Sequence, residues 1–145
     1  MHLNYLRPAL AAMALSAVLF VAPASAEMVG YKADMRGANE VPPVNQPGTG
    51  TLDSTYDTVS KKLTWTITYT GLSGPATGAH FHGPAAAGAN AGVVVPFSAP
   101  LTSPIRGEAT LTDAQAADLQ AGRWYANIHT AANAGGEIRG QVVKT

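Results

Sequence analysis

Hydrophobic and polar residues alternate most regularly in the segment Lys62–Thr70, where every second residue from Leu63 to Tyr69 is apolar and the residues between them are threonines. A period of two is typical of a β-strand that buries one face and exposes the other. The preceding segment Gly50–Tyr56 is also strand-like, and the polar turn Asp57–Ser60 predicts that the two segments form a β-hairpin.

Short apolar segments separated by Gly, Pro, Asn and Asp predict six further strands. They are Val29–Met35, Gly78–His82, Gly92–Phe97, Ile105–Leu111, Arg123–His129 and Glu137–Lys144. The proline-containing stretch Gly37–Gly48 predicts a loop or a sheet edge. One short helix is predicted over Thr112–Ala121, with Thr112 as its N-cap and Gly122 after its end. The pattern indicates an all-β fold, an antiparallel Greek-key β-sandwich of about eight strands with one short connecting helix.

The first 26 residues have the pattern of a secretory signal peptide, and residues 27–145 form the single predicted domain. Arg7 precedes an apolar run from Ala9 to Val21, and the small residues Ala24 and Ala26 mark a cleavage site. The run is shorter than the roughly 20 residues that a membrane-spanning helix needs. The sequence therefore predicts an exported protein, periplasmic or secreted, with no membrane span after signal cleavage.

Charge and composition narrow the possible chemistry. Lys and Arg number 9 and Asp and Glu number 9, so the formal net charge is zero. The absence of a basic face argues against nucleic acid as a partner. The chain has no cysteine, which excludes disulfides, thiolate metal sites and thiol catalysis. Imidazole nitrogens and oxygen atoms remain as the groups that could bind a metal or act in catalysis.

Three histidines are left after signal cleavage, and the strand pattern places them on one side of the sheet. His80 and His82 project together because side chains at i and i+2 share a face. In the segment Arg123–His129, the core takes Trp124, which leaves His129 on the opposite face. Three imidazoles without a thiolate suit copper or zinc. The sequence predicts a metal site of His80, His82 and His129, with a fourth position open.

Three neighbouring residues are candidates to support these ligands. Glu137 is one because a carboxylate can hold the remaining N–H of a ligand imidazole. Asn127 and Tyr125 are the others, since they share the face of His129. The alternative interpretation is that the histidines are surface residues or brace loops by hydrogen bonds. A glycosidase pair of Glu108 and Glu137 is disfavoured, because nothing in the sequence sets their separation.

Four motifs resemble the CHRD domain family, which is named after the signalling antagonist chordin and occurs in exported bacterial proteins. The motifs are ANEVPPV at 38–44, the Leu-Trp-Tyr strand at 63–72, AHFHGPA at 79–85 and YANIHTAANAGGEIRGQV at 125–142. The resemblance implies an all-β fold and leaves the activity of bacterial members undefined. The HxH strand is also similar to the copper-ligand strand of Cu,Zn superoxide dismutase. The similarity is partial, because the zinc-site cluster is missing and a copper-plus-zinc dismutase is not supported.

The leading hypothesis is therefore an exported metal-binding protein without enzymatic activity, which serves in metal storage, delivery or protection. Copper is preferred over zinc because nitrogen sites bind it more tightly. Its partners are then the metal ion and a protein that supplies or receives it. One alternative is an adhesion or protein-interaction module without metal, presenting the threonines of Thr64–Thr70. Another is a copper-dependent oxidoreductase that acts on superoxide.

Overall fold

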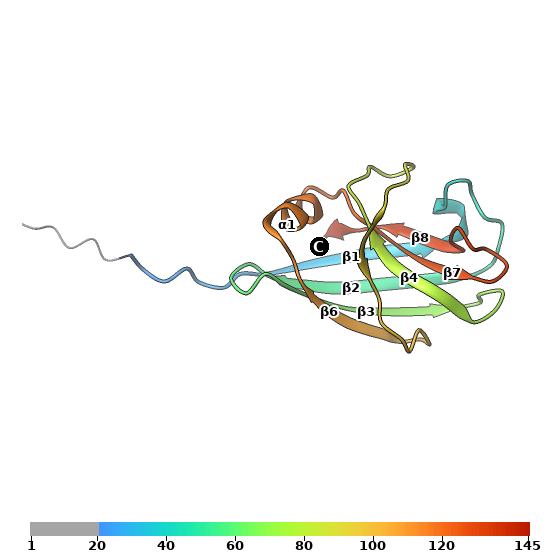
Figure 1. The fold of residues 1–145 in the computed structure, drawn as a ribbon, viewed down its shortest axis with the longest axis horizontal. Helices are drawn as coiled ribbons and strands as arrows, with labels where there is room; N and C mark the ends of the chain where they lie inside the picture. Colours follow the sequence, from blue (N-terminus) through green and yellow to red (C-terminus); the bar gives the residue numbers. More distant parts are fainter. Residues whose placement is uncertain (1–20) are drawn as a thin grey trace, which may run out of the picture.

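The computed structural model describes residues 21–145. Most of the predicted signal peptide, residues 1–20, lies outside this part of the chain. Residues 21–26 are exposed and belong to no helix or strand. They form an extended tail that leads away from the domain, and the helix α1 lies at the same end of the molecule (Figure 1).

Nine strands, one α-helix and one turn of 3-10 helix make up the described part of the chain. The elements are β1 (Met28–Arg36), η1 (Gly37–Asn39), β2 (Thr49–Asp57), β3 (Lys62–Thr70), β4 (Ala76–His82), β5 (Val93–Pro96), β6 (Ile105–Thr110), α1 (Asp113–Gln120), β7 (Tyr125–Thr130), β8 (Ile138–Gln141) and β9 (Val143–Lys144). The last predicted strand is thus divided into β8 and β9. The predicted strands and the single helix are otherwise found, with shifts of one or two residues at most of their ends.

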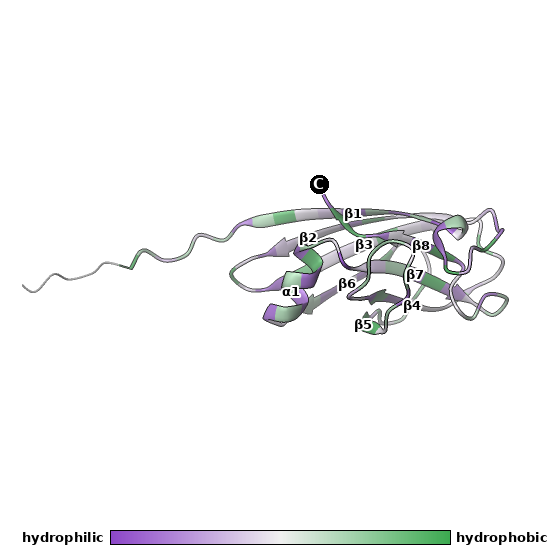
Figure 2. Cartoon of the chain, turned by 90° about the horizontal axis from the view of Figure 1, so that it is seen from above, coloured by the Kyte–Doolittle hydropathy of each residue, from purple (hydrophilic) through white to green (hydrophobic). Residues whose placement is uncertain are grey.

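The strands form one curled sheet with the order β5-β4-β7-β8-β1-β2-β3-β6, and every pairing is antiparallel. The sheet folds over into two layers, β6-β3-β2-β1 and β5-β4-β7-β8 (Figure 2). The chain crosses between the layers after β3, after β5 and through α1, which confirms the predicted all-β sandwich. β1 belongs to the seam, because Arg36 pairs with Arg139 of β8 while Tyr31 pairs with Lys144 of β9.

The apolar residues of the alternating strands meet between the layers. The ring of Trp65 on β3 contacts the ring of Phe81 on β4 edge to face, with centroids 5.2 Å apart. The indole of Trp124, which is fully buried, lies 5.4 Å from Phe81. Aromatic rings are among the largest apolar side chains, so their burial removes much apolar surface from water. Both tryptophans therefore fill the core, as the sequence predicts.

The helix α1 begins and ends as the sequence predicts. Thr112 accepts a hydrogen bond from the backbone N–H of Gln115, and the Gln115 side chain accepts one from the backbone N–H of Thr112. This reciprocal pair is a capping box, which satisfies two backbone donors that the first turn leaves free. After the helix, Gly122 has φ +69°, a left-handed conformation that glycine adopts without strain.

The face of β7 and β8 that points away from the core is covered, and here the sequence-based expectation is wrong. Alternation along the predicted strand Glu137–Lys144 places Arg139 on the charged outer face of that strand, yet only 2% of it is exposed. Its guanidinium donates hydrogen bonds to Asn90 Oδ1 and to the Ala89 carbonyl. The loop 83–92 therefore lies across this face and encloses the polar residues that alternation assigns to solvent.

Candidate metal centre

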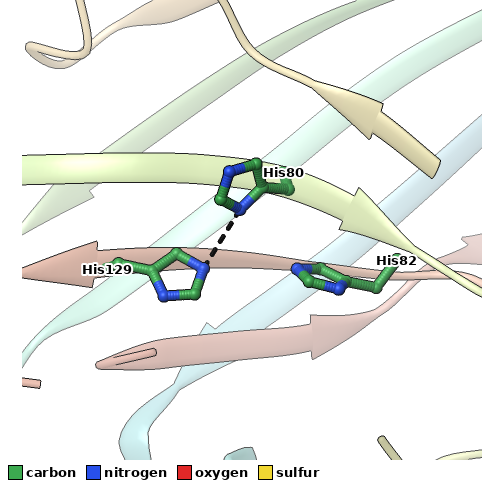
Figure 3. A group of neighbouring side chains, drawn as sticks. All are labelled: His80, His82 and His129. Atoms are coloured by element: carbon green, nitrogen blue, oxygen red, sulfur yellow. Dashed lines mark hydrogen bonds between the residues drawn. The ribbon is translucent and has the colours of Figure 1, made fainter. Parts of the chain in front are cut away.

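The three predicted ligands come together on two adjacent strands. His80 and His82 lie on β4, and His129 lies on β7 (Figure 3). In the antiparallel register His80 is opposite Asn127, and Gly78 is opposite His129. Residues i and i+2 of paired strands project on the same face. The register therefore gathers His80, His82, Asn127 and His129 at neighbouring positions of one sheet surface.

The imidazole nitrogens are close enough to serve one ion. His80 Nδ1 lies 3.1 Å from His129 Nε2, and the three potential ligand atoms all lie within 4.8 Å of one another. Two ligands of a tetrahedral site with metal–nitrogen bonds of about 2.0–2.1 Å are separated by about 3.3 Å. The His80–His129 pair already has nearly this spacing, and the widest pair reaches it by a movement of up to about 1.5 Å.

Backbone carbonyls fix the orientation of two of the rings. His82 Nδ1 lies 3.0 Å from the Ala91 carbonyl oxygen, and His129 Nδ1 lies 2.9 Å from that of Ala134. A carbonyl oxygen only accepts, so each Nδ1 carries the hydrogen and each neutral ring presents the lone pair of Nε2. Each anchoring carbonyl belongs to the loop that follows the histidine's own strand. The arrangement is the one by which proteins orient ligand imidazoles.

His82 Nε2 is the most informative atom of the site. His82 is 8% exposed, and its Nε2 is buried without a hydrogen-bond partner among residues 21–145. A buried polar atom without a partner costs about 1–3 kcal/mol. A bound cation satisfies this lone pair, so the chemistry of the donor fits a metal ion.

Burial also keeps the rings in the form that binds metal. Desolvation is the main cause that lowers the pKa of His80 and of His82. The two neighbouring imidazoles lower the pKa of His80 further, whereas contacts with the Ala91 carbonyl and with Asn127 partly offset the lowering at His82. A lowered pKa means that the neutral ring persists to lower pH than for an exposed histidine. Both rings are therefore unprotonated, and able to coordinate a metal, at neutral pH.

Tyr125, which the sequence places on the face of His129, contacts His82. Its ring is stacked on that of His82, with centroids 4.8 Å apart and an interplanar angle of 1°. The guanidinium of Arg139 also lies over the ring of Tyr125, 3.4 Å from its centroid. The Tyr125 hydroxyl also donates to the Ala91 carbonyl, which anchors His82. Tyr125 thus holds both the ring of His82 and its anchor.

The carboxylate of Glu137 has other partners than the imidazoles, contrary to the role proposed from the sequence. It accepts hydrogen bonds from the backbone N–H and hydroxyl of Ser73, from the Thr130 hydroxyl and from Asn133 Nδ2. Burial would raise the pKa of Glu137, but these hydrogen bonds lower it. Glu137 consequently ties the loop before β4 to the turn after β7 and acts on the site through the backbone.

Two residues of this region are missed by sequence reasoning. Arg139 is one, because its burial depends on the distant loop 83–92. Glu40 is the other: it is 5% exposed, and its carboxylate faces the side-chain nitrogen of Asn127 above Gly136. Burial raises the pKa of Glu40 to about 7, although the guanidinium of Arg139 and the amide of Asn127 act against it. A signal was present, since Glu40 lies inside the ANEVPPV motif.

A two-layer antiparallel fold with a cluster of imidazoles on the outer face of one layer defines a small all-β domain with a candidate metal centre. The family model described as CHRD domain matches residues 31–142, and the chain belongs to this family. A search of the curated proteins found no match, and neither did a search of the solved structures. No helix within residues 21–145 is both long enough and apolar enough to span a membrane.

Proposed function

We propose that this CHRD domain is exported and binds one transition-metal ion, with copper preferred, through His80, His82 and His129, for metal storage, delivery or protection. The buried, unpartnered Nε2 of His82 is the observation that carries the proposal. It lies in a group of three imidazoles whose ligand atoms are within 4.8 Å of one another. Three nitrogen ligands bind Cu²⁺ more tightly than the other common divalent ions.

The arrangement favours binding over turnover. Each of two ligands is held by a backbone carbonyl, and His82 is further held by the ring of Tyr125. Ligand side chains that are already fixed bind a metal tightly, because little conformational entropy is lost on binding. A partner protein that supplies or receives the metal is part of this proposal.

Titration of the purified mature protein with Cu²⁺ and with Zn²⁺, followed by calorimetry and by competition with a chelator, tests the proposal. We expect one ion per chain, tighter binding of Cu²⁺, and loss of tight binding in His82→Ala. Met28→Leu is the matched control, because Met28 is a potential soft ligand that is exposed and far along β1 from the cluster. A wild-type protein that binds no copper, or a His82→Ala variant that binds it equally well, contradicts the proposal.

A second candidate is an interaction module that works without metal. The outer face of the layer β6-β3-β2-β1 favours it, since threonines of β2 and β3 pair across the strands, as Thr51 does with Thr68. Their hydroxyls are hydrogen-bonded at 2.9 Å, and shallow clefts of about 400 and 270 Å³ lie along the same strands. Under this alternative, protein purified from its native compartment carries no stoichiometric metal.

The third candidate, a copper oxidoreductase, shares the histidine site and differs in turnover. Bound copper would supply one-electron chemistry there. Superoxide decay measured with the copper-loaded protein separates the two, because a pure binder gives no rate above that of free copper.

A further inference from the structure

Asn127 occupies the position between the two β4 histidines and His129. It lies on β7 directly opposite His80 and two residues before His129, with 2% of its surface exposed. Its Oδ1 is 3.0 Å from His129 Nε2. The same nitrogen lies 3.1 Å from His80 Nδ1. Both separations are close to the edge of a tetrahedral coordination sphere, about 3.3 Å for bonds of about 2.0–2.1 Å.

Neither His129 nor Asn127 supplies a hydrogen to the contact between His129 Nε2 and Asn127 Oδ1. His129 Nδ1 donates to the Ala134 carbonyl, so Nε2 of the neutral ring has a lone pair and no hydrogen. Asn127 Oδ1 is likewise an acceptor. Two acceptors at 3.0 Å are unfavourable unless a hydrogen or a cation lies beside both. In the metal-free protein the Nδ1–H of His80 donates to His129 Nε2, and a metal ion would take the place of this hydrogen while His80 changes to its other neutral tautomer. The lone pairs of His82, Asn127 and His129 face the same region, which suits a positive ion.

Glu40 explains why the oxygen of Asn127, and not its nitrogen, faces the imidazoles. Glu40 Oε1 and Asn127 Nδ2 both lie beside Gly136, where an added Cβ would be 2.7 Å from that nitrogen, and a hydrogen bond from the Asn127 amide lowers the pKa of Glu40. A carboxylate attracts the NH₂ group of an amide and repels its oxygen. Glu40 thereby turns the amide so that Oδ1 points toward the histidines.

We propose that Asn127 Oδ1 is the fourth ligand of the metal ion and that Glu40 is the residue that positions it. This inference rests on the proposed function, since it assigns the remaining ligand of the same site. An N₃O donor set has a consequence for the oxidation state that is bound. An amide oxygen is a hard ligand, which adds to the binding of Cu²⁺ or Zn²⁺ and little to that of Cu⁺. The site is thus expected to retain Cu²⁺ in preference to Cu⁺.

The experiment measures Cu²⁺ and Cu⁺ affinity by chelator competition, together with the electron paramagnetic resonance spectrum of the Cu²⁺ form. Asn127→Ala should weaken Cu²⁺ binding by about 10- to 100-fold and alter the spectrum, while Cu⁺ affinity changes by less than about threefold. Asn45→Ala is the control, because Asn45 is an exposed asparagine of the loop between η1 and β2. Both Cu²⁺ affinity and spectrum should be unchanged in this control.

A double-mutant cycle tests the part played by Glu40. Glu40→Gln should weaken Cu²⁺ binding in the wild-type background and have no further effect when Asn127 is already alanine. Independent, additive effects would show that Glu40 acts by its charge alone and would overturn its positioning role. Equal Cu²⁺ affinity and spectrum in wild type and Asn127→Ala overturn the ligand assignment. If wild type binds no copper at all, the proposed function fails instead, and the two failures are distinguishable.

Discussion

Replacing Glu40 with glutamine should remove a large part of the pH dependence of folding in the metal-free protein. The carboxyl group of Glu40 is 5% exposed, and burial raises its pKa from 4.5 to about 7, against the opposing effects of Arg139 and Asn127. In the unfolded chain the same group is solvated and has its ordinary pKa. The folded protein therefore binds this proton more tightly than the unfolded chain does, which links stability to pH.

The sign and the size of the effect follow from these two pKa values. A raised folded-state pKa contributes stability that is fully present below pH 4.5 and is lost as the pH rises through about 7. At about 1.4 kcal/mol for each pH unit, the interval corresponds to about 3 kcal/mol. Glutamine carries no charge at any pH. Relative to wild type, Glu40→Gln should therefore be more stable at pH 8 by up to about 3 kcal/mol and similar at pH 4.

Urea unfolding followed by tryptophan fluorescence between pH 4 and pH 8, with a chelator present, measures this difference. Subtracting the two stability curves isolates Glu40, because the histidines titrate in both proteins. Glu108→Gln provides the control, since Glu108 lies on the surface in an ion pair with Lys62 at 3.1 Å, and exposed pairs contribute little. Parallel curves for wild type and Glu40→Gln across this range would refute the reasoning.

Three further predictions concern the metal site and the helix. Copper at about 100 times its Kd should stabilise the wild-type protein by about 2.7 kcal/mol in thermal unfolding, and this gain should vanish in His82→Ala. Gly136→Ala should destabilise the fold and weaken copper binding in the same titrations, because φ is +126° and the new Cβ would lie 2.7 Å from Asn127 Nδ2. Thr112→Ala should cost about 1 kcal/mol in urea unfolding, by loss of the helix cap, and leave copper affinity unchanged.

The strand pattern could be read from the sequence because each strand buries one face against the same core. Alternation in Lys62–Thr70 predicts which side Trp65 takes, and the same reasoning places His80 and His82 together. The sequence does not show which residues lie opposite each other on neighbouring strands. That His80 lies opposite Asn127 depends on the register of β4 and β7, which nonlocal packing sets.

The surroundings of the histidines could not be predicted, for two physical reasons. First, alternation reports only the core. The burial of Arg139 under the loop 83–92, and of Glu40 within the loop 37–48, therefore has no periodic signal. Second, the groups that orient His82 and His129 are backbone carbonyls, which every residue has and no motif reveals. Because these carbonyls leave no trace in the sequence, the sequence predicts that Glu137 binds the remaining N–H of a ligand imidazole. In the structure a backbone carbonyl binds that N–H.

The seam between the two layers reaches the metal centre through the side chain of Arg139. The backbone of Arg139 forms the ladder pair with Arg36 that joins β8 to β1, and its guanidinium lies on the ring of Tyr125, which in turn is stacked on His82. A small slip of one layer past the other would therefore tilt a ligand ring. The spectrum of a bound Cu²⁺ ion would then report the relative position of the two layers. This can be measured in variants of the seam that leave every ligand unchanged.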